Sequence, residues 1–368
     1  MNYARIIGTG SYLPEKVLTN ADLEQMIETT AEWIIARTGV EERHIAAPGE
    51  TTCDLAEQAS RWALAAAGIE PADIDLIILG TTTPDHVFPS VATQLQHRLG
   101  CYGSPAFDVQ AVCTGFVYAL DIAHRFIRTG AARRALVVGA DTFTRIIDWT
   151  DRGTCILFGD GAGAFVLQAA EERAGVLSAV MRSDGSGGDL LSVPGGGSRY
   201  PTTMDTVQQG MHHIHMNGRE VFRFATRVMS QATQEAVEQA GLTLDDIQLV
   251  IPHQANQRII EAALKSLDIP LERCMINLDR YGNTSTASIP IATCEAFEAG
   301  RILPGNKLVF VGFGAGLTWG AAVVEWSGPF AGIRKVRPAR YRWYARIRSI
   351  ILRVLRHIDA WIWGRQNS

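Results

Sequence analysis

The chain repeats itself once, and this repeat limits its possible folds more than any other feature. At an offset of 173 residues, the two copies read AGIEPADIDLII (67–78) and AGLTLDDIQLVI (240–251). The same offset pairs the strand-like runs ALVVGAD (135–141) and KLVFVGFG (307–314). Each copy has a helix end marked by glycine, an acidic turn and a β-branched strand. A single offset of this size indicates one duplicated β-α-β-α-β-β unit and not a solenoid.

The predicted strands are almost continuously apolar, as in LIIL (76–79) and LVV (136–138). Such strands are typical of sheets covered by helices on both faces, so the predicted fold class is α/β. We place the first half at residues 1–172 and the second half at residues 173–328. Ligands of these sheets gather at loops and helix N-termini near the strand ends.

Composition excludes several classes of protein. The 368 residues are 47% hydrophobic and 20% charged, an ordinary globular balance. The N-terminus lacks a signal peptide's long apolar run, so we expect a cytoplasmic protein with reduced thiols. None of the six cysteines forms a CxxC pair. The histidines of MHHIHM (211–216) have no cysteine or carboxylate spaced to complete a ligand set, so we expect no metal.

Cys113 is the first candidate for chemistry. It lies in DVQAVCTGFVYAL (108–120), directly before an apolar helix pattern. Free N–H groups and the dipole at a helix N-terminus favour an anion, so we expect a lowered pKa for the Cys113 thiol. The alternative is that Cys113 is a small buried hydrophobic residue, which is common for a free cysteine.

Two further candidates lie in loops of the second half. His253 follows a buried strand that Pro252 ends, and Asn283 lies in a turn favoured by Gly282. Taken singly, a structural histidine and a simple helix cap are the commoner interpretations. Taken together with Cys113, they place a thiol, an imidazole and an amide at corresponding loops of the two halves. Such a set can acylate a thiol and stabilise an oxyanion.

The chain resembles 3-oxoacyl-[acyl-carrier-protein] synthase III, the initiating condensing enzyme of type II fatty acid synthesis, over roughly residues 3–326. Seven stretches in the family's order carry this resemblance: IIGTGSYLPEK, EWIIARTGVEERHIAAP, AFDVQAVCTGFVYAL, TDRGTCILFGDGAGA, IPHQANQRII, DRYGNTSTASIP and FGAGLTWGAA. The resemblance implies a thiolase-like fold with five layers, α-β-α-β-α, and an internal duplication. That expectation agrees with the repeat.

The resemblance also implies the chemistry. Cys113 matches the family nucleophile, which takes an acyl group from acyl-CoA. His253 and Asn283 match the pair that supports decarboxylation of malonyl-acyl carrier protein, whose carbanion then attacks the thioester. Backbone N–H groups of Cys113 and Ala315 are expected to form the oxyanion hole for the acyl group. The implied reaction needs no cofactor besides the CoA thioester substrate, and the family is homodimeric, so we expect a homodimer.

Binding residues follow from the same resemblance. The residues expected to hold CoA and the substrate arm are Thr29, Trp33, Arg37, Arg152, Gly218, Phe222 and Asn256. The expected acyl pocket consists of Phe88, Phe143, Phe158 and Met216. The expected docking residues for the acidic carrier protein are Arg223, Arg258 and Lys265. For the charged and exposed members of these sets, an ordinary solvated helix face is the alternative.

The resemblance does not cover the extension at residues 329–368. Residues 331–368 contain ten Lys or Arg and one acid, while the whole chain has a net charge of −4. Apolar residues recur at three- and four-residue steps with arginines opposite, which predicts a basic amphipathic helix. We expect peripheral contact with the inner face of a membrane through residues 339–363; docking on the body or help in carrier-protein capture are the alternatives. No basic face of the body indicates a nucleic-acid partner.

Two other functions remain open from the sequence. A related enzyme of the same fold could use the same three residues to make a polyketide, a quinolone or another secondary metabolite, or to transfer an acyl group to another acceptor. A non-catalytic scaffold subunit of a membrane assembly is the alternative from another class. Since Cys113, His253 and Asn283 are all present, the sequence favours an enzyme.

Overall fold

Two mixed β-sheets organise the part of the chain that the computed structural model describes, residues 2–328. The first sheet has the order β1 (Tyr3–Tyr12), β7 (Gly161–Ala170), β6 (Arg134–Asp141), β4 (Leu76–Gly80) and β5 (Ala106–Val109). The second has the order β11 (Leu249–Pro252), β12 (Lys307–Gly314), β13 (Thr318–Glu325) and β8 (Gly175–Ser183). The chain passes from the first sheet to the second within residues 171–174.

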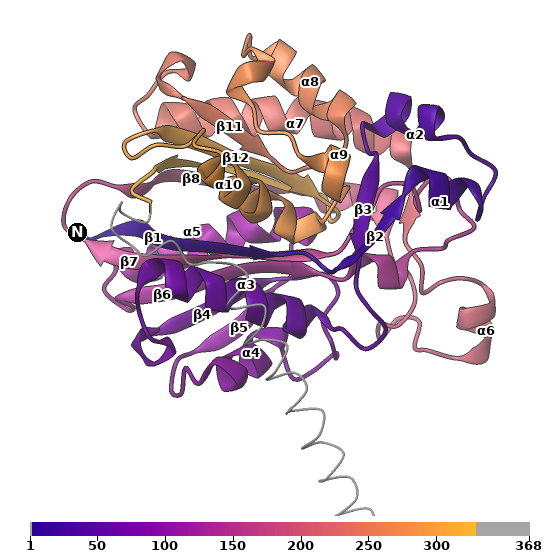
Figure 1. Ribbon diagram of the computed structural model, residues 1–368, viewed down its shortest axis with the longest axis horizontal. Coiled ribbons are helices and arrows are strands. Elements are labelled where there is room, and N and C mark those ends of the chain that lie inside the picture. Colours follow the sequence, from indigo (N-terminus) through magenta and orange to yellow (C-terminus); the bar gives the residue numbers. More distant parts are fainter. Residues whose placement is uncertain (1, 329–368) are drawn as a thin grey trace, which may run out of the picture. The chain divides into compact units, whose positions relative to one another are not determined.

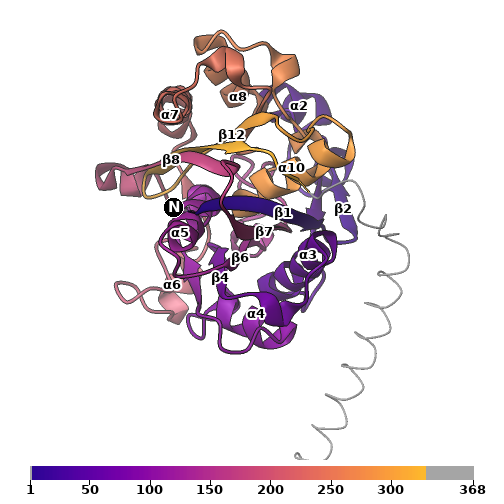
Figure 2. The ribbon, with the colours of Figure 1, turned by 90° about the vertical axis from the view of Figure 1, so that its left-hand side faces the viewer.

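Helices complete five layers (Figures 1 and 2). The first sheet is covered outside by α3 (Thr52–Ala67) and α4 (Val91–Leu99), and the second by α7 (Gly218–Gln239) and α8 (Gln257–Ser266). Between the sheets lie α5 (Gly115–Arg128) and α10 (Ser288–Glu298), whose apolar residues pack on both. The predicted α-β-α-β-α layering of a thiolase-like fold is therefore confirmed.

Smaller elements gather around one end of the sheets (Figure 1). They include the hairpin of β2 (Lys16–Thr19) and β3 (Glu42–Ile45) together with short helices. These are α1 (Asn20–Glu24), α2 (Ala31–Thr38) and α9 (Leu278–Tyr281). A separate excursion carries β9 (Leu191–Ser192), α6 (Met204–Gln208) and β10 (His215–Met216). Short 3₁₀ turns include η1 (Pro71–Asp73), η2 (Val112–Thr114), η5 (Leu244–Asp246) and η7 (Ser285–Ala287).

The duplication is visible in the element bounds. The starts of β4 and β11, of β6 and β12, and of η2 and η7 each differ by 173 residues. Val112 and Ser285, which open the two 3₁₀ turns, share a positive φ of 46° and 50°. This shared backbone makes Thr286 the counterpart of Cys113, while Asn283 lies three residues earlier in the same loop. Helix α10 has 11 residues and α5 has 14, and the chain regains the offset before β12.

Glycines let the turns before α5 and α10 approach the strands closely. A Cβ atom on Gly80 would lie 2.8 Å from the backbone of Gly115, and one on Gly139 would lie 2.4 Å from the Thr286 carbonyl oxygen. Real Cβ contacts are never this short, so a larger residue would push the turns away. The N-terminal ends of both central helices are thereby held against the carboxyl ends of the first sheet.

None of the helices in residues 2–328 combines the length and the apolar character that crossing a bilayer requires. The amphipathic helix predicted for residues 329–368, with its expected membrane contact at 339–363, lies outside the described residues.

Candidate active site

Cys113 lies in the turn η2, directly before α5, as the sequence predicts. The residue is 4% exposed, and its sulfur lies 3.4 Å from the Ser285 hydroxyl oxygen. The preceding residue, Val112, has a φ of 46°. This is an outlier for a β-branched residue, and backbone strain of this kind is concentrated at functional sites.

The expected lowering of the Cys113 pKa is wrong. Burial raises the pKa of the thiol to about 12, and the negative charge of Asp141 acts in the same direction. The hydrogen bond with Ser285 favours the thiolate but does not offset the burial. Burial deprives a charged sulfur of water, so the resting residue is a thiol at neutral pH.

His253 directly follows β11 and is fully buried. Its backbone N–H donates to the Val311 carbonyl oxygen at 2.7 Å, and its Nδ1 lies 2.7 Å from the Ser288 hydroxyl. Nε2 has no partner among the described residues. Burial lowers the pKa of the imidazole to about 3, so the ring is neutral at pH 7.

Asn283 is held by its backbone between two neighbours. Its N–H donates to the Leu157 carbonyl at 2.8 Å, and its carbonyl accepts from the Gly159 N–H at 3.0 Å. The side-chain oxygen Oδ1 accepts from the Ser285 N–H at 2.9 Å. Because Oδ1 is engaged in this way, the amide Nδ2 is turned away from Ser285 and keeps its hydrogens for another acceptor.

The structure brings the three predicted catalytic residues together. Ser285 contacts both Cys113, through its hydroxyl, and Asn283, through its N–H. A Cβ atom built on Gly312 would lie 3.5 Å from the Cys113 carbonyl oxygen and 3.7 Å from the His253 Cβ, so these two residues flank the same glycine. The ring of Phe313 meets the His253 ring edge-on, with centroids 5.5 Å apart.

The two predicted oxyanion-hole residues, Cys113 in η2 and Ala315 after β12, both lie beside the end of β12. A Cβ on Gly314 would lie 2.8 Å from the Cys113 backbone nitrogen, so this strand end passes directly beside the nucleophile. Ala315 follows in the turn to β13, and its carbonyl accepts from the Thr318 hydroxyl at 3.2 Å. The positive φ in this turn, +130°, falls on Gly316 and not on Ala315. The turn therefore accepts alanine without strain.

Three of the residues expected to bind CoA form one cluster. The Arg152 guanidinium lies 4.4 Å from the centre of the Trp33 ring, and that of Arg37 lies 5.6 Å from it. Arg152 also donates to the Glu28 carbonyl oxygen at 3.1 Å. Since Arg152 covers the Trp33 ring directly, an adenine between them requires the arginine to move.

The other expected CoA residues have separate positions. Asn256 caps α8 through Oδ1, which accepts from the Arg258 N–H, and its Nδ2 donates to the Arg37 carbonyl at 3.0 Å. The asparagine thus ties α8 to α2. Gly218 begins α7 at an exposed position, and half-buried Phe222 lies one turn later. Thr29 lies just before α2, and its buried hydroxyl has no partner among the described residues.

The structure unites only part of the expected acyl pocket. Phe143 and Phe158 are buried and stack with centroids 4.4 Å apart. Met216 is half-buried and packs against a different apolar cluster, on the second sheet. Phe88 is 84% exposed on the loop before α4. Within one chain, Phe88 therefore does not enclose the same space as the Phe143–Phe158 pair.

The three expected docking residues are all exposed. Arg258 and Lys265 lie seven residues apart, on the same face of α8, and neither forms an ion pair in the described part of the chain. Arg223 lies on the neighbouring α7, paired with Glu220 at 3.1 Å.

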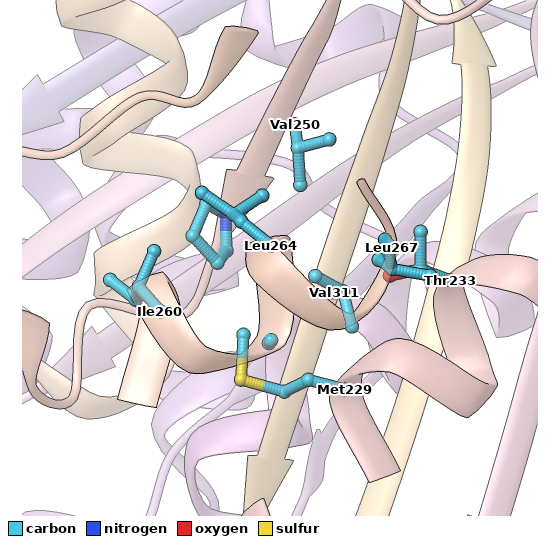
Figure 3. A pocket seen from close by; sticks show the side chains of 9 residues that line it. Met229, Thr233, Val250, Ile260, Leu264, Leu267 and Val311 are labelled. Atoms are coloured by element: carbon cyan, nitrogen blue, oxygen red, sulfur yellow. The ribbon is translucent and has the colours of Figure 1, made fainter. Parts of the chain in front are cut away.

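A small cavity under α8 is not part of the active site (Figure 3). Its volume of about 10 Å³ is roughly what a single water molecule occupies. It lies between α7, α8 and the strands β11 and β12, and its lining contains no titratable group. In residues 2–328, no group of three histidine, cysteine or acidic side chains is arranged to hold a metal ion.

Sequence reasoning missed three polar residues of this site: Ser285, Ser288 and Asp141. Asp141 is fully buried at the end of β6, and its carboxylate accepts from Thr286 of the second half. The repeat offered one signal for it, because position 141 ends its strand just as position 314 ends β12.

Comparison with known proteins agrees with this geometry. The family profile described as 3-oxoacyl-[acyl-carrier-protein (ACP)] synthase III matches residues 107–185, and that of the synthase III C terminal matches residues 237–326. A beta-ketoacyl-[acyl-carrier-protein] synthase III of Thioalkalivibrio sulfidiphilus is 55% identical over 325 residues, covering 88% of this chain and 100% of the relative. One of Desulfitobacterium hafniense is 53% identical over 322 residues, covering 88% and 97%.

A solved structure shows the same arrangement. The crystal structure of 3-oxoacyl-[acyl-carrier-protein] synthase III from Aquifex aeolicus superposes with a TM-score of 0.82 at 45% identity, covering 88% of this chain and 100% of that one. On sequence, fold and site together, this chain belongs to the beta-ketoacyl-[acyl-carrier-protein] synthase III family of acyl-transferring condensing enzymes.

Proposed function

We propose that this protein joins an acyl group from an acyl-CoA to malonyl-[acyl-carrier protein] by decarboxylative Claisen condensation, giving a 3-oxoacyl-[acyl-carrier protein] for fatty acid synthesis. The observation that carries the proposal is the buried set of Cys113, His253 and Asn283. The Cys113 backbone lies beside the strand end of Gly314. The set offers two neutral donors: His253 Nε2, which has no partner among the described residues, and the amide of Asn283, whose Oδ1 already accepts from Ser285.

In the first step, the Cys113 sulfur attacks the thioester carbon of acyl-CoA. The C–S bond to CoA breaks, and the proton lost by the thiol ends on the departing CoA sulfur. The negative charge that develops on the carbonyl oxygen is stabilised by the backbone N–H groups of Cys113 and Ala315. Because burial raises the pKa of the thiol, attack and proton loss are coupled and no stable thiolate precedes them.

In the second step, the malonyl group loses CO₂ and leaves its electron pair as an enolate. His253 and Asn283 donate hydrogen bonds to the enolate oxygen, where the charge develops. The enolate carbon then attacks the acyl-cysteine, and the Cys113 sulfur leaves and regains a proton. A neutral imidazole suits this step, because an imidazolium would protonate the carbanion.

Substrate entry is proposed at Trp33, Arg37 and Arg152. Their cluster offers an aromatic face and two guanidinium groups, which suit the adenine and phosphates of CoA. Thr29, Gly218, Phe222 and Asn256 are proposed to line the path of the substrate arm. We assign no cofactor, because each bond change above is met by the substrates and the three side chains.

The acyl pocket and the carrier-protein surface are further parts of the proposal. The stacked pair of Phe143 and Phe158 is proposed to line the acyl chain, with Met216 nearby on the substrate path. The exposed cations Arg223, Arg258 and Lys265 are proposed to receive the acidic carrier protein, which would make this association depend on salt.

The proposed assembly is a homodimer in the cytoplasm. Strand β5 is the edge of the first sheet, so one side of its backbone is unpaired, and such an edge can pair with a second copy. Val87 and Phe88 on the loop before α4 are 89% and 84% exposed, which favours burial against a partner. The basic extension at 339–363 is proposed to touch the membrane surface, with two extensions per dimer raising avidity.

The test is a condensation assay with purified enzyme, malonyl-acyl carrier protein and acyl-CoAs from acetyl to dodecanoyl. Mass spectrometry of the carrier protein should show a 3-oxoacyl product with at least one primer, and His253→Ala should lose it. If no primer yields product although the carrier protein remains malonylated, the proposed reaction is wrong.

A further inference from the structure

Asp141 is a buried carboxylate that the proposed reaction leaves unexplained. It is fully buried, and six hydrogen bonds reach it. The donors to Oδ1 are the Thr82 N–H at 2.7 Å, the Thr83 N–H and hydroxyl at 3.1 and 2.9 Å, and the Thr81 hydroxyl at 3.1 Å. The donors to Oδ2 are the Thr286 hydroxyl at 2.6 Å and the Thr286 N–H at 3.1 Å. Every partner is a donor, which is the arrangement that an ionised carboxylate needs.

The duplication relates the contact between Asp141 and Thr286 to an equivalent place beside Cys113 in the first half. Thr286 is the counterpart of Cys113, and Asp141 is the counterpart of Gly314, at the same offset. In both halves the end of the strand meets the backbone N–H of the turn: Asp141 accepts from Thr286, and Gly314 passes beside the Cys113 nitrogen. The second-half turn therefore carries its own anion, while the first-half turn has a residue without a side chain there.

The Thr286 contact leads directly into the active site. Thr286 follows Ser285, whose φ of 50° is unfavourable for a non-glycine residue. Ser285 in turn holds Oδ1 of Asn283 through its N–H and contacts the Cys113 sulfur through its hydroxyl. Such a backbone persists only where its surroundings hold it in place, and the two bonds to Asp141 do so on its C-terminal side.

We propose that Asp141 is a positioning residue, which fixes the Ser285–Thr286 turn and so aims the Asn283 amide at the enolate oxygen. In the second half, the Asp141 carboxylate accepts from the N–H of Thr286. In the first half, the reacting oxygen of the acyl group is proposed to accept from the equivalent N–H of Cys113. This inference rests on the proposed function for its catalytic part. The anion site beside Thr286 stands independently of the reaction.

The first test uses Thr286→Val, which keeps the shape of the side chain and removes the hydroxyl that binds Asp141. Thr293→Val is the matched control. Thr293 is as buried as Thr286 but lies on α10, where its hydroxyl donates to the Ile289 carbonyl of its own helix. The measurements are CO₂ release from malonyl-acyl carrier protein and the rate of acyl transfer from acetyl-CoA to Cys113.

We expect Thr286→Val to slow decarboxylation about tenfold, the effect of one lost charge-assisted hydrogen bond, and to leave acyl transfer within about twofold. Thr286→Ser should restore decarboxylation, and Thr293→Val should change neither rate. Equal losses in both rates, or no loss of decarboxylation, would overturn the positioning role.

A second test is independent of catalysis. Asp141→Gly imitates Gly314 and opens the carboxylate site, so formate should raise the melting temperature of this variant above that in equal sodium chloride. The wild-type protein should show no such difference. Formate without effect on a folded variant, or an equal effect on the wild type, overturns the anion site. If the wild type neither decarboxylates nor condenses, the proposed function fails, whereas the formate result still decides the anion site.

Discussion

The two turns before the central helices have the same backbone and different tasks. Val112–Cys113–Thr114 and Ser285–Thr286–Ala287 both open with a positive φ, and both lead into a helix between the sheets. The first turn carries a thiol, and its backbone nitrogen lies beside Gly314. The second turn is closed by six hydrogen bonds around Asp141, two of them from Thr286. The two turns thus differ in the residue at the end of the neighbouring strand: Gly314 lies beside the reactive turn, and Asp141 lies beside the structural one.

This difference shows how a duplicated fold can divide its work. One copy carries the nucleophile in its turn, and the other uses the equivalent N–H of its turn to bind the first half. The second half also supplies the donors His253 and Asn283, so the site needs both halves.

The largest expected effect comes from removing the thiol from the first turn, and it tests whether a thiol in the second turn can replace it. Cys113→Ala should lower condensation by about 10³-fold or more, since the acyl acceptor is lost. Adding Thr286→Cys should not restore it, because that side chain faces Asp141. Product formation measured by mass spectrometry checks both. Recovery in the double variant would show that the turns are interchangeable, contrary to the comparison.

His253 should separate the two steps. Its counterpart at the end of β4 is Gly80, which has no side chain to donate. His253→Ala removes one of the two enolate donors, so we expect decarboxylation to fall about 10²–10³-fold. Acyl transfer to Cys113 should change by less than about threefold, because that step uses backbone donors. Single-turnover measurements of both steps test this difference. An equal loss of rate in decarboxylation and in acyl transfer would contradict the assignment of His253 to decarboxylation alone.

Gly314 should tolerate no side chain. In Gly314→Ala, the new methyl group would lie 2.8 Å from the Cys113 nitrogen, so the turn or the strand must shift. A misplacement of reacting groups by about 1 Å can cost about 10²-fold in rate, and we expect a loss of that order in acyl transfer. The control is Ala315→Gly, one residue later, which should retain the wild-type rate. Comparable rates in the two variants would show that acyl transfer does not require a glycine at position 314.

The smallest expected effect is on stability in acid. The folded-state pKa of His253 is lowered to about 3, so its contribution is present above pH 6.5 and is lost as the pH falls towards 3. Each pH unit within that window costs about 1.4 kcal/mol per proton that only the unfolded chain binds. Urea unfolding between pH 7.5 and 5 should therefore show a shallower pH dependence for His253→Gln than for the wild type. Identical slopes would mean that His253 is not buried as a neutral ring.

Much of the fold and of the site follows from sequence patterns. The repeat predicted the offset that relates β4 to β11 and β6 to β12, and the motif stretches placed Cys113, His253 and Asn283 in loops that the structure brings together. These successes share a cause: both rest on local runs of apolar residues and on fixed spacing along the chain.

The failures depend on packing across the chain. The pKa of Cys113 was mispredicted because the helix N-terminus is a local feature, whereas the burial that dominates comes from both halves. Asp141 was missed because its main partner, Thr286, lies 145 residues away. No spacing rule reports contacts of this kind.

The most direct test of the central claim is to locate the acyl group on the enzyme. After a short pulse with acetyl-CoA, peptide mapping by mass spectrometry should find one acetyl group, on the peptide that contains Cys113. The other five cysteines are buried as well, so burial alone would not select among them. An acetyl group on another residue, or its persistence in Cys113→Ala, would contradict the division of labour between the two turns.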